Sequence, residues 1–125
     1  MTKSIMFVDD DPEILNLYGG MFRRRGYEVL TAEESERALE MLKESTPDLL
    51  LLDVMMPEIN GIELCQRIRA LPGYEQTPVI ILSAYSDTGI IEQAFAAGAN
   101  DYVLKPIDPK VLAAKIHELL GTTEG

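Results

Sequence analysis

Short runs that are almost entirely apolar limit the folds open to this chain. The runs are Ser4–Val8, Asp48–Leu52 and Val79–Leu82. A strand that shows no alternation between apolar and polar residues is buried on both faces, as in a parallel sheet covered by helices on each side. Each run is followed by a longer segment in which apolar residues recur at helical spacing. This alternation predicts an α/β fold.

The whole chain divides into five strand–helix units. Asp11 followed by Pro12 matches an N-cap and a first helical position, and Gly26 ends that helix. The expected strands are Ser4–Val8, Tyr27–Thr31, Asp48–Leu52, Val79–Leu82 and Tyr102–Leu104. The expected helices are Pro12–Arg25, Glu34–Glu44, Ile62–Leu71, Asp87–Ala97 and Pro109–Leu120. Five such units predict one doubly wound domain, with five helices around a five-stranded parallel sheet of flavodoxin-like order 2-1-3-4-5.

Length and charge restrict the function classes. The 125 residues suffice for one domain, and the formal net charge of −10 repels phosphate backbones. No apolar run is long enough to span a bilayer, the N-terminus does not resemble a signal peptide, and the single Cys65 excludes an internal disulfide. We expect a cytoplasmic domain at residues 1–121 that binds neither nucleic acid nor membrane directly. Residues 122–125 form a polar tail, either a free terminus or the start of a linker.

Polar residues stand at the ends of the predicted strands, where a parallel sheet places its sites. They are Asp9 and Asp10, Asp53, Ser83 and Lys105. Converging carboxylates repel one another, and a hard divalent cation relieves that repulsion, which suits Mg²⁺ with Mn²⁺ as the alternative. A hydroxyl and an ammonium facing the same point suit a phosphoryl group. A carboxylate nucleophile beside Mg²⁺ suits the formation of an aspartyl phosphate.

Four motifs occur in order at these strand ends. They are Val8-Asp9-Asp10-Asp11-Pro12, Leu52-Asp53-Val54-Met55-Met56-Pro57 with Gly61, Leu82-Ser83-Ala84, and Tyr102-Val103-Leu104-Lys105-Pro106. Together they resemble the receiver domain of two-component response regulators, within the CheY-like superfamily. The resemblance extends from Ser4 to Leu120 and indicates a single-domain receiver.

The resemblance implies the phosphoacceptor and the metal ligands. Asp53 would accept a phosphoryl group from the phosphohistidine of a sensor histidine kinase or a phosphotransfer protein. Asp9, Asp10 and Asp53 would hold Mg²⁺ together with the backbone carbonyl of Met55. The chain would thus catalyse its own phosphorylation and dephosphorylation, although it acts mainly as a signalling protein.

The resemblance also implies which residues respond to the phosphoryl group. Ser83 and Lys105 would each bind a phosphoryl oxygen, and a cis peptide before Pro106 would aim Lys105 inward. Tyr102 would change its rotamer as Ser83 moves. The signal would reach an unknown downstream protein through the face built from the fourth helix, the fifth strand and the fifth helix.

Some positions depart from the common pattern of the family. Ile107 stands where many members carry Phe. In the winged-helix branch, the last helix carries an acid and an arginine that pair between subunits, whereas this chain has Val111 and Lys115. The missing acid argues against that dimer, and we expect either a monomer or a phosphorylation-dependent dimer.

Two large side chains predict a slow loss of the phosphoryl group. Met55 and Tyr85 lie two residues beyond Asp53 and Ser83, at positions that flank the phosphoryl group in this family. Their bulk would restrict the hydrolytic water. The alternative function is a docking module of the same fold that does not use phosphorylation, but the intact set of strand-end residues argues against it. No glycine motif for a dinucleotide or a nucleoside triphosphate is present.

Overall fold

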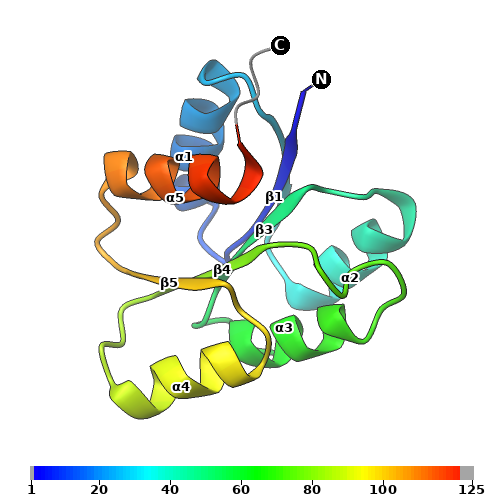
Figure 1. The fold of residues 1–125 in the computed structure, drawn as a ribbon, viewed down its shortest axis with the longest axis vertical. Coiled ribbons are helices and arrows are strands. Elements are labelled where there is room, and N and C mark those ends of the chain that lie inside the picture. The colour runs from blue at the N-terminus through cyan, green and yellow to red at the C-terminus, as the bar shows by residue number, and fades with distance from the viewer. Residues whose placement is uncertain (1, 122–125) are drawn as a thin grey trace.

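The computed structural model describes residues 2–121, which form a five-stranded sheet with five helices (Figure 1). The strands are β1 (Ser4–Val8), β2 (Glu28–Ala32), β3 (Leu49–Asp53), β4 (Val79–Ser83) and β5 (Asp101–Leu104). The helices are α1 (Pro12–Arg24), α2 (Ser35–Glu44), α3 (Gly61–Arg69), α4 (Thr88–Ala96) and α5 (Pro109–Leu120). All neighbouring strands are parallel and their order is β2-β1-β3-β4-β5. The predicted fold class and strand order are confirmed.

The bounds of the elements differ from the predicted ones by one or two residues at several ends. The second strand begins at Glu28 rather than Tyr27, because the Tyr27 amide donates to the Phe22 carbonyl at 3.1 Å. Gly26 makes this turn possible, since its φ of 98° lies in the left-handed region that favours glycine. The Tyr27 amide therefore closes the end of α1 and is not available for a hydrogen bond between strands.

Three strands end one residue later than predicted: β2 at Ala32, β3 at Asp53 and β4 at Ser83. Asp53 and Ser83 belong to the candidate site. β3 includes Asp53, because the next amide, that of Val54, donates to the Leu82 carbonyl at 3.1 Å. β4 includes Ser83, whose carbonyl accepts from the Lys105 amide at 2.8 Å. The backbone at Asp53 and at Ser83 is thus fixed by hydrogen bonds between strands, and both side chains extend from the sheet rather than from a loop.

Alternate residues of the strands face two separate helical layers. Phe7 and Leu51 pack with residues of α1 and α5, whereas Met6 and Leu50 pack with residues of α2, α3 and α4. Figure 1 shows these two groups of helices on opposite sides of the sheet. Every residue of β3 and β4 is buried. Burial on both faces is the physical reason for apolar runs without alternation.

The register brings the carboxyl ends of four strands to one edge of the sheet. It pairs Val8 with Leu52, Asp53 with Leu82 and Ser83 with Leu104. Because the strands are parallel, the residues that end or follow them emerge side by side at this edge. The peptide bond between Lys105 and Pro106 is cis, as the resemblance implied.

Other expectations concern the cap of α1, the single cysteine, membrane spans and the tail. Asp11 is the N-cap of α1, since its Oδ1 accepts from the Glu13 amide at 2.9 Å. Cys65 is fully buried in the core. Within residues 2–121, no helix is both long and apolar enough to cross a membrane. The predicted tail, residues 122–125, lies outside the described residues, so the domain bounds stay a prediction.

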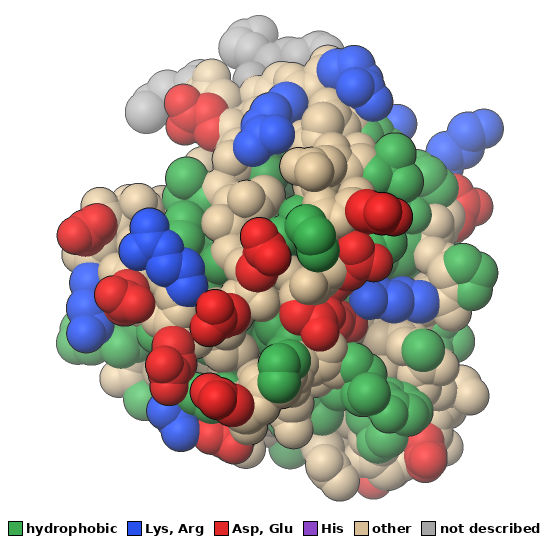
Figure 2. Space-filling model, turned by 180° about the vertical axis from the view of Figure 1, so that it is seen from behind, with side chains coloured by type: hydrophobic (Ala, Val, Ile, Leu, Met, Phe, Trp, Pro, Cys, Tyr) green, Lys and Arg blue, Asp and Glu red, His purple; other side chains and the backbone are tan. Residues whose placement is uncertain are grey.

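The surface carries the negative charge that the composition predicts. Acidic side chains extend over much of the face shown in Figure 2, and basic side chains are dispersed among them rather than gathered into one patch. Hydrophobic side chains collect towards the lower right of the same view. The chain has 21 acidic and 11 basic residues, and on this face the acidic side chains form a mixed, acid-rich surface.

Candidate functional site

Three carboxylates converge at the carboxyl edge of the sheet. Asp9, Asp10 and Asp53 each offer an oxygen that lies within 4.8 Å of the others. Asp9 is 1% exposed and Asp53 is 2% exposed, whereas Asp10 is exposed to solvent. The predicted convergence of these strand-end acids is confirmed, and it concentrates negative charge in a largely buried place.

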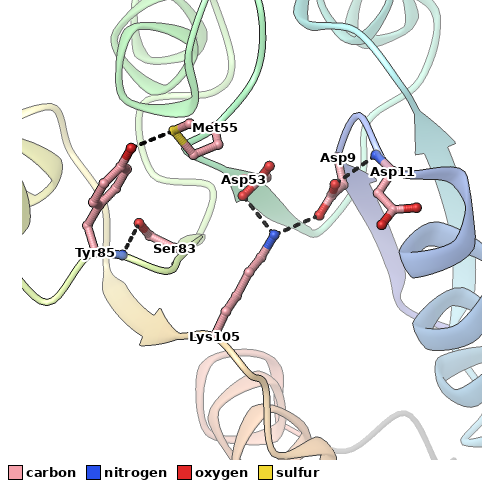
Figure 3. A network of polar contacts seen from close by, with 7 residues as sticks. All are labelled: Asp9, Asp11, Asp53, Met55, Ser83, Tyr85 and Lys105. Atoms are coloured by element: carbon pink, nitrogen blue, oxygen red, sulfur yellow. Dashed lines mark hydrogen bonds and ion pairs between the residues drawn. The ribbon is translucent and has the colours of Figure 1, made fainter.

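The ammonium group of Lys105 lies between two of these carboxylates (Figure 3). Its Nζ is 2.9 Å from Asp53 Oδ1 and 3.2 Å from Asp9 Oδ2. The Lys105 side chain is 26% exposed, so the contacts are only partly screened by water. The Asp11 amide donates to the other Asp9 oxygen, Oδ1, at 2.9 Å. Asp9 is thus held from two sides.

Burial and neighbouring charges shift the pKa values of Asp53 and Lys105. Burial raises the pKa of Asp53, and the neighbouring Asp9 and Asp10 raise it further, against the lowering effect of Lys105. Burial by itself lowers the pKa of Lys105, but its contacts with Asp53 and Asp9 outweigh burial, and the net shift is upward. At Asp53, burial and the two neighbouring carboxylates therefore outweigh the contact with Lys105.

The donor set fits a hard divalent cation. Carboxylate oxygens are the ligands that Mg²⁺ prefers, and an exposed Asp10 leaves room for metal-bound water. The Met55 carbonyl belongs to the loop directly after Asp53, and its part as a ligand stays a prediction. The sulfur of Met55 points instead to the Tyr85 hydroxyl.

Ser83 is fully buried and is bonded to its own loop. Its Oγ accepts from the Tyr85 amide at 3.0 Å. Within the described residues, Ser83 makes no side-chain hydrogen bond to Asp53 or Lys105. Its hydroxyl proton is free for another acceptor, because this hydrogen bond uses only an oxygen lone pair.

Tyr102 is half-buried and packs against the core beneath α2, α3 and α4. Its hydroxyl donates to the Tyr85 carbonyl at 2.8 Å. The loop after β4 is therefore joined to both predicted switch residues: the Tyr85 amide bonds to Ser83 and its carbonyl to Tyr102. The predicted change of the Tyr102 rotamer stays a prediction.

Two close contacts of the site were not predicted from the sequence. The Tyr85 hydroxyl donates to Met55 Sδ at 2.9 Å, although both residues were identified only as large neighbours. Gly61 lies directly against the Asp53 backbone, so that a Cβ atom there would overlap the Asp53 carbonyl. The motif included Gly61, but it carried no signal of this approach.

The sequence of the chain matches one family over most of its length. Residues 5–117 match the family model described as the response regulator receiver domain. The DNA-binding response regulator MtrA of Mycolicibacterium smegmatis is 36% identical over 124 residues, which are 99% of this chain and 53% of that protein. The chain spans about half the length, or less, of the curated relatives it matches.

Solved structures show the same architecture. The chemotaxis protein CheY4 of Vibrio cholerae superposes with a TM-score of 0.92 at 27% identity, covering 96% of this chain and 100% of that one. A CheY-like response regulator receiver domain protein from Methanospirillum hungatei superposes with a TM-score of 0.88 at 30% identity, covering 94% and 93%. The strand-end residues therefore occur within a known fold.

Proposed function

The chain belongs to the response regulator receiver domain family, and we propose that it is a phosphorylation-controlled switch whose phosphoacceptor is Asp53. One observation supports this most directly: the Lys105 ammonium lies between Asp53 and Asp9 in a site with excess negative charge. Such a site is suited to a carboxylate that must bind a cation and then carry a phosphoryl group.

The proposed reaction transfers a phosphoryl group from a phosphohistidine to Asp53. A carboxylate oxygen of Asp53 forms a bond to phosphorus while the phosphorus–nitrogen bond breaks, and that electron pair stays on the imidazole. When bound at Asp9, Asp10 and Asp53, with the Met55 carbonyl, Mg²⁺ supplies positive charge that offsets repulsion between the carboxylates and the phosphoryl oxygens. Lys105 pairs with a phosphoryl oxygen, and its contact with Asp53 in the unphosphorylated chain supports this role.

The proposed switch uses the loop after β4. A phosphoryl oxygen on Asp53 offers an acceptor to the Ser83 hydroxyl, and Ser83 moves towards it. Because the Tyr85 amide is bonded to Ser83 and the Tyr85 carbonyl to Tyr102, a movement of Ser83 displaces both contacts. The phosphorylated form thereby favours one arrangement of this loop and of Tyr102.

The proposed output surface is the face formed by α4, β5 and α5. Phe95, Leu104 and Val111 are large apolar residues that are exposed on these elements. Lys115 pairs with Asp101 of the same molecule at 2.8 Å. This internal pair and the apolar Val111 support a contact with a downstream protein rather than the charged dimer of the winged-helix branch.

The donor in this proposal is a sensor histidine kinase or a phosphotransfer protein, and the reaction takes place in the cytoplasm. DNA binding is a property named for MtrA, which is about twice as long as the matched segment. The acid-rich surface supports the absence of direct nucleic-acid binding by the described residues.

Intact mass after incubation with acetyl phosphate and Mg²⁺ tests the proposal. We expect one phosphoryl adduct that requires Mg²⁺ and is absent from Asp53→Asn. The absence of an adduct, together with amide spectra that do not change on adding beryllofluoride, would favour the docking module that does not use phosphorylation.

The proposed rate of dephosphorylation has its own test. The Met55 and Tyr85 side chains contact each other beside the site and would restrict the approach of water. Tyr85→Ala opens this side, so the phosphoryl group should be lost about threefold faster or more, equivalent to a barrier lowered by about 0.7 kcal/mol. The decay of the phosphorylated mass measures this, and an unchanged rate would contradict the steric argument.

A further inference from the structure

The Met55 sulfur accepts a hydrogen bond from the Tyr85 hydroxyl beside the acidic site (Figure 3). Met55 is 55% exposed and Tyr85 is 37% exposed. Together with Asp10 they line a groove between the loop after β3 and the first turns of α4. A reagent dissolved in water therefore reaches the thioether without any unfolding of the core.

The other described methionines are less accessible. Met6 is fully buried and Met56 is 8% exposed. Met21 and Met41 are half-buried and pack against the two core clusters. Because oxidation follows exposure, Met55 is the first of these five thioethers that a dissolved oxidant should reach.

A peroxide changes the chemistry of this contact. The Met55 sulfur attacks one oxygen of hydrogen peroxide, the oxygen–oxygen bond breaks, a sulfur–oxygen bond forms, and water leaves after a proton transfer. The sulfur is oxidised by two electrons and the peroxide is reduced. A thioether sulfur is a weak hydrogen-bond acceptor, whereas a sulfoxide oxygen is a strong one. The Tyr85 hydroxyl, already 2.9 Å from the sulfur, is placed to donate to the new oxygen.

We propose that Met55 is a modification site, at which reversible oxidation to the sulfoxide strengthens the contact with Tyr85 and prolongs the life of the phosphoryl group on Asp53. The effect on lifetime rests on the proposed function, because it requires Asp53 to carry a phosphoryl group. The stronger hydrogen bond holds both side chains across the approach of the hydrolytic water. Oxidant and phosphorylation would then act on one site, and a sulfoxide reductase would restore the first state.

The first experiment does not depend on phosphorylation. The protein is treated briefly with hydrogen peroxide, oxidation at each methionine is measured by peptide mass spectrometry, and the ring signals of Tyr85 are followed by NMR. We expect Met55 to be oxidised before Met21 and Met41, with a shift of the Tyr85 signals that is absent in Met55→Leu. Oxidation of Met55 no faster than that of Met21 and Met41, or unchanged Tyr85 signals, would overturn the modification site.

The second experiment measures the lifetime of the phosphoryl group before and after oxidation. We expect the loss to slow about threefold, the scale of one strengthened hydrogen bond, and to recover after treatment with methionine sulfoxide reductases. Tyr85→Phe keeps the ring but lacks the donor, so oxidation should leave its rate unchanged, as in Met55→Leu. An equal slowing in Tyr85→Phe, or none in the natural chain, would overturn the regulation. Failure of Asp53 to accept any phosphoryl group would overturn the proposed function and this regulation, while the first experiment would still decide the modification site.

Discussion

Gly61→Ala probes how closely β3, which carries the proposed phosphoacceptor Asp53, approaches α3. A Cβ atom at position 61 would lie 2.7 Å from the Asp53 carbonyl carbon, even closer to its oxygen, and 3.1 Å from Val54 Cα. These are backbone atoms, which cannot rotate away as a side chain can. The Gly61 amide also donates to the Val54 carbonyl at 3.2 Å, which ties the two segments together.

The expected effect on stability follows from two opposing contributions. Relief of the overlap needs a backbone shift of about 1 Å, and such overpacking costs about 1–3 kcal/mol. Alanine in place of glycine in a helix stabilises by about 0.5–1 kcal/mol. We therefore expect Gly61→Ala to lower the free energy of unfolding by about 1–2 kcal/mol. We also expect slower phosphorylation, because Asp53 is the residue displaced.

Gly20→Ala is the matched control. Position 20 lies inside α1, and a Cβ atom there would meet only the end of the flexible Arg24 side chain, at 3.6 Å. This variant should be more stable by about 0.5–1 kcal/mol. Urea denaturation measures both variants, and the rate of adduct formation from acetyl phosphate reports on Asp53. A stability of Gly61→Ala equal to that of Gly20→Ala would refute the overlap.

Three further predictions concern the metal, the core and the pH dependence of stability. Asp10→Asn removes one of the three converging carboxylates. Mg²⁺ should then bind about tenfold more weakly, which is a loss of about 1.4 kcal/mol in binding free energy. A rise in Tm with Mg²⁺ equal to that of the natural chain would contradict this. Arg69→Met removes the hydrogen bonds of the guanidinium to the carbonyls of Gly98 at 2.7 Å and Tyr74 at 2.8 Å, and should cost about 2–3 kcal/mol in urea unfolding. A loss under about 0.5 kcal/mol would show that water replaces these contacts. Burial raises the pKa of Cys65 above its ordinary 9.0 and that of Tyr74 above 10.0. The unfolded chain then ionises first, so their contribution is complete below about pH 9 and is lost as the pH rises further, which unfolding at graded alkaline pH measures. A Cys65→Ala chain whose stability falls as steeply above pH 9 would assign the loss to other groups.

The strands and the residues at their ends could be predicted because local patterns carry them. A sheet covered on both faces requires apolar runs, and parallel strands bring their carboxyl ends to one edge whatever the details of packing. For this reason the sequence alone predicts that Asp9, Asp53, Ser83 and Lys105 lie at one site. Several strand ends differ from the predicted bounds by one residue. The start of β2 and the end of β3 do so because they depend on hydrogen bonds to Phe22 and Leu82 in other elements.

Contacts inside the site could not be predicted in the same way. The sequence predicts that Met55 and Tyr85 lie near Asp53. Their hydrogen bond, however, joins residues 30 positions apart and depends on side-chain rotamers. No local pattern singles out Arg69 within the helix predicted over Ile62–Leu71. The structure shows it bonded to Gly98, 29 positions away, where it fixes the turn between α4 and β5.

The sequence by itself thus determined the order of the elements, the covered parallel sheet and the set of groups at its carboxyl edge, because each depends on the periodicity and identity of neighbouring residues. Only the tertiary structure decided that Lys105 lies between Asp9 and Asp53, that Gly61 touches the Asp53 backbone and that Tyr85 bonds to Met55. These are distances between segments far apart in the chain. The packing of the two helical layers determines these distances, and no local sequence pattern predicts that packing.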